Sequence, residues 1–117
     1  MYGTEKGNDV YELPTYFADR TFVYEQVCRQ GRLALYCQTH KVAAVQRYEV
    51  VRIRIRAAHT WPNGAQTPEH EAYPSPESWG RDGWTFYTQE AATKHMTALA
   101  IAQAFSALRE VEEASRQ

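Results

Sequence analysis

The sequence has few of the residues that mark a metal centre or a disulfide framework. It contains two cysteines and four histidines among 117 residues, and no C-x-x-C or H-E-x-x-H zinc spacing occurs. Glycine loops that cradle phosphate and the G-x-S-x-G nucleophile elbow are missing as well. We therefore expect a protein without a bound metal or cofactor and favour a non-enzymatic role. A catalytic triad built from distant residues stays open, because spacing along the chain does not reveal one.

Long apolar runs are also lacking. The longest, residues 98–108, is interrupted by Gln103 and Ser106 and is well short of the ~20 residues that span a bilayer. No apolar segment follows Met1, so we expect no signal peptide. These features predict a cytoplasmic protein that makes no contact with a membrane.

Charge of one sign is concentrated in one part of the chain. The net charge is −1, yet residues 20–60 hold eight Lys and Arg against two Glu, a local charge of +6. Residues 1–19 carry −3 and residues 61–117 carry −4. The acidic flanks could neutralise the basic middle in the folded protein, or the middle could stay exposed as a binding surface.

The central stretch, residues 47–59, reads RYEVVRIRIRAAH. Apolar and cationic side chains alternate along it, and a period of two predicts a half-buried strand. One face then belongs to the core, with Val51, Ile53, Ile55 and Ala57. The other face is basic, with Arg52, Arg54 and Arg56.

A hairpin precedes this strand. Its predicted arms are residues 21–29 and Leu33–His40, and its predicted turn is Gln30-Gly31. That register predicts a core face made of Phe22, Tyr24, Cys28, Leu33, Leu35 and Cys37. Tyr36 and His40 then lie on the same face as the arginine row. Cys28 and Cys37 do not face each other, so we expect two buried free thiols and no disulfide.

The remaining elements complete an α+β fold in one domain, residues 1–117. The short connection 41–46 favours an antiparallel meander. A fourth strand at 84–87 is expected at an edge of the sheet, followed by a helix from Gln89 to about Ala114 with Thr88 as its N-cap. We thus predict a four-stranded antiparallel meander with one long C-terminal helix packed on one face.

Two segments lie outside this pattern. Residues 1–19 are predicted to form an irregular arm, anchored to the body by Tyr11, Leu13, Tyr16 and Phe17. Residues 60–83 are predicted to form a long proline-rich loop, which Trp61, Tyr73 and Trp79 could hold down over one end of the sheet.

The helix carries two apolar stripes that are rotated by roughly 100°. The first is formed by Ala92, Met96, Leu99 and Ala100, and the second by Ile101, Ala104, Phe105, Leu108 and Val111. One sheet cannot cover both. Either residues 1–19 cover the second stripe, or Ile101, Phe105 and Leu108 form the interface of a homodimer.

The leading functional hypothesis is a binding or adaptor protein whose basic face contacts an acidic protein partner. The candidate residues are Arg52, Arg54, Arg56, Tyr36 and His40. The same face could instead bind single-stranded nucleic acid, because arginines track phosphates while an aromatic ring stacks on a base. A further alternative is a metal-dependent enzyme at His59, Glu69 and His70.

Residues 79–86 read W-G-R-D-G-W-T-F and are followed by Glu90-Ala91. This string resembles the ending of small uncharacterised bacterial and phage proteins with a W-G-x-x-G-W-T-F…E-A pattern, which implies no activity. Its first three residues also resemble the namesake of the WGR domain, a module associated with nucleic acids in which a β-meander precedes a helix. That resemblance implies a binding role for Trp79 and Arg81, and Trp61 is the third candidate in the loop. Unlike the WGR pattern, Trp79 here follows a proline-rich loop and not a strand.

Overall fold

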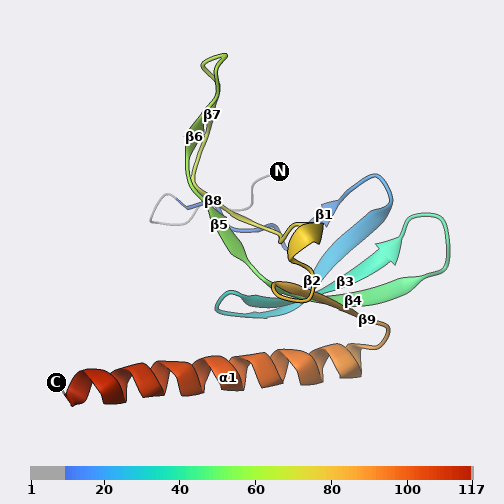
Figure 1. The fold of residues 1–117 in the computed structure, drawn as a ribbon. Helices are drawn as coiled ribbons and strands as arrows, with labels where there is room; N and C mark the ends of the chain where they lie inside the picture. The colour runs from blue at the N-terminus through green and yellow to red at the C-terminus, as the bar shows by residue number, and fades with distance from the viewer. Residues whose placement is uncertain (1–9, 117) are drawn as a thin grey trace.

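The computed structural model describes residues 10–116. An antiparallel sheet has the strand order β1-β2-β3-β4-β9, and one long helix packs against it (Figure 1). The fold class is therefore confirmed, with the fourth predicted strand at an edge and a fifth strand, from the arm, at the other edge. The elements are β1 (Tyr16–Ala18), β2 (Phe22–Gln30), β3 (Leu33–His40), β4 (Gln46–Arg52), β9 (Gly83–Phe86) and α1 (Gln89–Ser115).

The prediction of one continuous strand over residues 47–59 was wrong. β4 ends at Arg52, and the amide of Ile53 donates to the carbonyl of Arg32 at 2.7 Å. Beyond Ile53 the chain leaves the sheet and pairs with the segment predicted as a loop, forming a narrow ribbon that projects from the body (Figure 1). The ribbon contains β5 (Arg54–Arg56), β6 (His59–Thr60), β7 (Gln66–Thr67) and β8 (His70–Ala72), and a short helix η1 (Pro76–Ser78) follows it.

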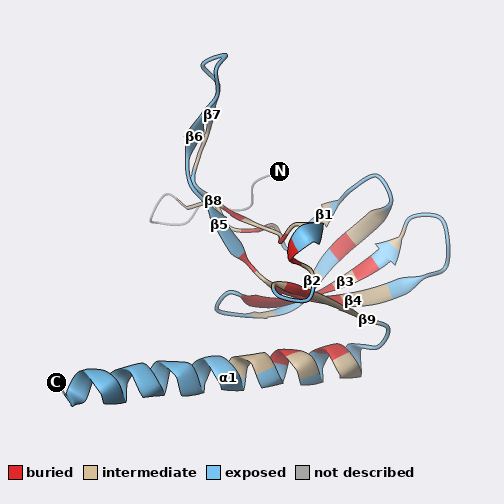
Figure 2. Cartoon of the chain, in the orientation of Figure 1, coloured by how far each residue is buried: buried red, intermediate tan, exposed pale blue. Residues whose placement is uncertain are grey.

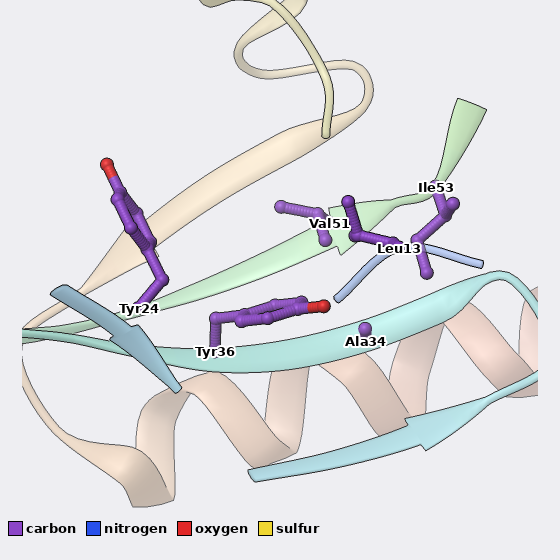
Figure 3. Close-up of a cluster of buried hydrophobic side chains, with 6 residues drawn as sticks. All are labelled: Leu13, Tyr24, Ala34, Tyr36, Val51 and Ile53. Atoms are coloured by element: carbon purple, nitrogen blue, oxygen red, sulfur yellow. The ribbon is translucent and has the colours of Figure 1, made fainter. Parts of the chain in front are cut away.

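Both faces of the sheet are buried, which overturns the prediction of one core face and one basic face. Neighbouring residues Val50 and Val51 are each 0% exposed, although their side chains point to opposite faces. On the side of the helix, Leu33, Leu35 and Val50 of the sheet form a cluster with Ala92 and Met96 of α1. Figure 3 shows the opposite cluster, on the side of the sheet away from α1: Leu13, Tyr24, Ala34, Tyr36, Val51 and Ile53.

The hairpin register also differs from the prediction. The turn is Gly31-Arg32, with Gly31 at a positive φ of 61°, and Gln30 pairs with Leu33. A bulge between Gln26 and Cys28 then shifts the pairing again. As a result the six residues predicted to share a core face are divided between both faces.

The surroundings of the two cysteines also differ from the prediction. Both thiols are free, as predicted, but Cys28 is exposed and Cys37 is partly exposed. The sulfur of Cys28 lies 3.9 Å from the sulfur of Met96 on the helix. Burial of the two thiols, which the sequence predicted, was therefore wrong.

The helix begins as predicted and extends past the sheet. Thr88 Oγ1 accepts the amide of Ala91 at 3.1 Å as the N-cap. The first half packs on β3, β4 and β9, whereas residues 101–116 are exposed along their whole length (Figure 2). No helix among residues 10–116 has both the length and the apolar character of a membrane span.

The described part of the N-terminal arm, residues 10–19, lies on the face away from the helix. Leu13 is buried there and Phe17 packs on the same cluster, while Tyr16 is 62% exposed. This part of the arm therefore does not cover the second apolar stripe of α1, and residues 1–9 of the predicted arm lie outside the described residues.

Candidate binding surfaces

Four arginines converge where β4 ends. Main-chain pairing brings together the hairpin turn, the end of β4 and the turn before β9, because Ile53 bonds to the turn and the amide of Arg52 donates to the carbonyl of Asp82 at 2.8 Å. We call this group the arginine cluster, and its members are Arg32, Arg52, Arg54 and Arg81.

Asp82 is the only carboxylate of the described residues that forms an ion pair with the arginine cluster. Its Oδ2 lies 3.0 Å from Arg54 Nη1 and 3.4 Å from Arg81 Nε. The side chains of Arg54 and Arg81 remain 52% and 75% exposed, so these pairs contribute little to stability. One carboxylate against the exposed guanidinium groups of Arg32, Arg54 and Arg81 leaves an excess of positive charge at this edge.

Arg52 lies on the helix side of the sheet. Its guanidinium carbon is 5.6 Å from the centre of the Trp84 ring, and its Nε donates to the carbonyl of Arg81 at 3.3 Å. It borders a groove of about 320 Å³ along the helix, with Gln103 and Glu110 among the other lining residues.

The other members of the predicted basic face lie outside the cluster as we define it. Arg56 is exposed on β5, opposite His70. Tyr36 is 0% exposed, and its hydroxyl donates to the carbonyl of Pro14 at 2.8 Å. His40 closes the turn after β3, where its Nδ1 accepts two main-chain amides. The prediction that Tyr36 and His40 share an open face with the arginines was wrong, because the arm and residues 73–79 cover that side of the sheet.

A hollow on the covered face is lined by three aromatic rings. Its volume is about 500 Å³, within the range of small-ligand sites. Tyr73 stands in the middle, with ring centroids 5.6 Å from Tyr24 and 6.4 Å from Trp79. We call it the aromatic pocket, and it is lined by Tyr24, Glu49, Tyr73, Pro74, Pro76 and Trp79.

One wall of the aromatic pocket is fixed by a close contact between Trp79 and the edge strand. The Trp79 ring packs so tightly on Gly83 that a Cβ at that position would clash with it. Trp79 Nε1 also donates to Thr85 Oγ1 at 3.0 Å. Tyr73 and Trp79 therefore hold residues 73–79 against the sheet, whereas Trp61 is 51% exposed on the ribbon.

Glu49 is the acidic group of the aromatic pocket and is 7% exposed. Its carboxylate accepts the Tyr73 hydroxyl at 2.7 Å and the Thr85 hydroxyl at 3.2 Å. No cation among residues 10–116 forms an ion pair with it. Burial raises the pKa of Glu49, against the opposing effects of the two hydrogen bonds and of the Arg47 charge.

A chain of polar side chains continues from the pocket. The Tyr24 hydroxyl donates to Asp19 at 3.1 Å and accepts from Gln38 at 3.0 Å, and Gln38 accepts Arg47 Nε at 2.9 Å. Burial raises the pKa of Tyr24 to about 12. The pKa of Asp19 is lowered, chiefly by the amide of Phe22. The two buried side chains of this network, Tyr24 and Gln38, therefore both have hydrogen-bond partners.

A second buried carboxylate ties the N-terminal arm to the ribbon. The Glu71 carboxylate accepts hydrogen bonds from both terminal nitrogens of Arg29, at 2.8 and 2.7 Å. It also accepts one from the amide of Leu13 at 2.9 Å. A cavity of about 650 Å³ lies between the arm and β8, lined by Phe17 and His70 among others. The hydrogen bonds that Arg29 donates to Glu71 raise the pKa of Arg29.

The candidate metal ligands do not come together. The His59 ring meets Trp61 edge-on at 4.4 Å, and His70 Nδ1 lies 2.8 Å from the carbonyl of Pro68. Glu69 is exposed. Within the described part of the chain, no three potential ligands are grouped closely enough to hold a metal ion.

The second apolar stripe of the helix is open in the single chain. Its large residues are between 52% and 65% exposed, and no described residue covers them. We call residues 101–115 the free half of α1. Its exposed large apolar side chains are Ile101, Phe105, Leu108 and Val111.

Sequence reasoning missed the aromatic pocket. The available signal was Glu49, a lone acidic residue directly before Val50 and Val51 in a strand that would otherwise be apolar at that point. An acid in such a position must be hydrogen-bonded or paired when the strand is buried. Its partners Tyr73 and Thr85 lie far along the chain, so the sequence did not identify them.

Comparison with known proteins gives no match, either to a protein-family model, to a curated protein or to a solved structure.

Proposed function

We propose that the protein is a non-enzymatic binding module whose arginine cluster contacts an acidic segment of a partner protein. The observation that carries this proposal is the imbalance of charge around Asp82. Three of the four arginines, Arg32, Arg54 and Arg81, are exposed. Guanidinium groups suit the role because their planar donors match the two oxygens of a carboxylate.

The charge of the whole chain sharpens the argument. A net charge of −1 means that the molecule as a whole does not attract acidic partners. A local concentration of arginines on such a protein directs an acidic partner to one place and increases its rate of association. Arg56, on the adjoining ribbon, extends the basic surface outward.

Single-stranded nucleic acid is the alternative ligand for the arginine cluster. Such binding usually combines phosphate contacts with aromatic rings on which bases stack. Tyr36 cannot stack on a ligand because it is buried, and the ring of Trp84 lies beside the guanidinium of Arg52. Neither ring is open for base stacking at the cluster, and this favours an acidic protein over single-stranded nucleic acid.

The proposal is tested by fluorescence anisotropy with a labelled glutamate-rich peptide at low and moderate salt. The double variant Arg54→Glu with Arg81→Glu should bind about tenfold more weakly than the wild type. Arg20→Glu with Lys41→Glu makes the same change in net charge at two exposed positions near the end of the hairpin opposite its Gly31-Arg32 turn, and it should bind like the wild type. Equal loss in both double variants, or no binding at low salt, would contradict the proposal.

A labelled oligothymidylate in the same assay separates the two ligand classes. If the protein binds the oligothymidylate more tightly than the peptide at equal salt, the acidic-protein proposal fails. Nucleic acid then becomes the ligand of the arginine cluster. A steep loss of that binding with added salt would agree with phosphate contacts.

The proposed occupant of the free half of α1 is a second copy of the chain. In an antiparallel pair centred on Leu108, Phe105 would face Val111, so large apolar side chains meet. The large apolar side chains of this stripe are each more than half exposed in the single chain, so the pairing would bury them.

Sedimentation equilibrium tests this pairing. The wild type should dimerise as concentration rises, and Leu108→Glu should remain monomeric because two buried carboxylates would meet at the centre of the pair. Glu90→Gln, at the start of the helix and exposed, should not change the association. A wild-type protein that stays monomeric at high concentration would remove the dimer.

A further inference from the structure

We infer that the aromatic pocket binds the guanidinium group of an arginine side chain presented by a partner. This site is separate from the arginine cluster, lies on the face of the sheet away from α1, and takes a ligand of opposite charge. Three observations carry the inference: a hollow of about 500 Å³, three aromatic rings in its lining, and a buried carboxylate with no ion-pair partner among the described residues.

The carboxylate of Glu49 has acceptor capacity left over. A carboxylate offers about four lone-pair positions, two on each oxygen. Tyr73 occupies one position on Oε1, and Thr85 occupies one on Oε2. Each oxygen therefore keeps one further position, and a guanidinium group can fill such a pair with its forked donors.

The aromatic lining suits the rest of the guanidinium group. A planar cation is attracted to the faces of tryptophan and tyrosine rings. The rings of Tyr73 and Trp79 are stacked at an interplanar angle of 28°, while Tyr24 meets Tyr73 at 61°. Pro74 and Pro76 add apolar surface beside them. Arginine is more weakly hydrated than lysine, so it loses less on entering such a site.

The arginine nearest to this carboxylate in the chain is already held by other contacts. Arg47 donates from Nε to Gln38 at 2.9 Å, and its guanidinium carbon lies 5.0 Å from the centre of the Phe22 ring. It influences Glu49 through its charge without forming an ion pair. A buried carboxylate without a paired cation carries a desolvation cost, and an arginine from outside would offset that cost.

The first test is a titration followed by NMR, with N-acetyl-arginine methylamide as the probe. The indole N–H signal of Trp79 and the ring signals of Tyr73 should shift in a saturable way, with a dissociation constant on the order of 1 mM. N-acetyl-citrulline methylamide has nearly the same shape without the charge, and it should bind about tenfold more weakly. Equal shifts with both compounds would overturn the inference, as would shifts that do not saturate.

Variants separate this site from other acidic positions. Glu49→Gln should lose about tenfold in affinity for the arginine probe, whereas Glu25→Gln removes an exposed carboxylate on β2 and should bind as the wild type does. Trp79→Leu keeps the carboxylate and removes one ring, and it should also weaken binding if the mutant chain folds. Unchanged binding in folded Glu49→Gln would end the proposal. A thermal unfolding transition establishes that each variant is folded.

Discussion

The two faces of the sheet are built from different chemistry. Toward the helix, the buried residues are aliphatic, such as Leu35 and Val50, together with Ala92 and Met96 of the helix. On the opposite face, aromatic rings surround hydrogen-bonded polar groups that include the buried carboxylates Glu49 and Glu71. The helix-facing side is held by apolar contacts between buried side chains. The opposite side is held in addition by directional hydrogen bonds.

The difference teaches where specificity resides in a small domain. Aliphatic packing stabilises the fold in proportion to the area buried and has little directionality. Buried polar groups cost free energy unless each has a partner, so they fix the positions of the arm and of residues 73–79. The face with the hydrogen-bonded polar network also carries the aromatic pocket.

The largest expected effect comes from the helix-facing layer. Leu35 is 1% exposed, so Leu35→Ala should lower the free energy of unfolding by about 2–5 kcal/mol through lost burial and a cavity. Leu108→Ala, on the free half of α1, should change it by less than about 0.5 kcal/mol when measured at low protein concentration. Urea unfolding followed by circular dichroism measures both. Equal losses would mean that the free half is buried in the monomer.

The polar network of the other face should be next in size. Glu71→Gln keeps the shape but sets an amide donor against the guanidinium of Arg29, and we expect a loss of about 1.5–3 kcal/mol. Asp82→Asn breaks ion pairs to exposed arginines and should cost below about 1 kcal/mol. If the two substitutions have the same effect in urea unfolding, the Glu71 network adds no more than a surface pair.

The contact between Trp79 and Gly83 offers a steric test of the aromatic pocket. Gly83→Ala places a methyl group into the Trp79 ring, and we expect a loss of about 1–3 kcal/mol with a shift in tryptophan fluorescence. Gly31→Ala puts a side chain at a positive φ with open space around it. It should cost about 1–2 kcal/mol and leave the fluorescence unchanged. Unchanged fluorescence in Gly83→Ala would contradict the position of the Trp79 ring.

The smallest expected effect is a difference between the wild type and Glu49→Gln in how the free energy of unfolding depends on pH. Burial raises the pKa of folded Glu49 above its ordinary value of 4.5. The proton is then held more tightly in the folded state, so this contribution to stability is present below that value and is lost as pH rises through the raised pKa. Urea unfolding at several pH values should therefore show Glu49→Gln gaining relative to the wild type as pH rises.

Other charged groups near Glu49 do not imitate this response. Burial raises the pKa of Tyr24 and Tyr73 away from the acidic range. Asp19 titrates at low pH with a lowered pKa, so its contribution is lost as pH falls. It is present in both proteins and cancels in the comparison. A difference that does not vary with pH would contradict the raised pKa of Glu49.

The sequence predicted the elements because the signals for them are local. Thr88 marked the start of the helix, and the alternation around Val51 and Arg52 marked a strand. The order of the strands followed from short connections. These parts of the fold depend on neighbours in the chain, so spacing alone was sufficient.

The faces of the sheet were not predictable in the same way. A bulge between Gln26 and Cys28 put Phe22 and Tyr24 on the face opposite to that of Leu33 and Leu35. Tyr36 was predicted to lie on the open basic face. It is buried because Pro14 and Tyr73, which are distant in sequence, pack against it. The arginine cluster was found only in part, because Arg32 and Arg81 join it through tertiary pairing.

The most direct test of the difference between the two faces is an NMR titration of the Glu49 side-chain carboxyl, alone and with the arginine probe. The pKa of Glu49 should lie above its ordinary value of 4.5 in the free protein. It should fall when N-acetyl-arginine methylamide saturates the pocket, because a neighbouring cation favours the carboxylate, and it should not fall with the citrulline analogue. A carboxyl that titrates at or below the ordinary value and ignores the arginine probe would contradict the account.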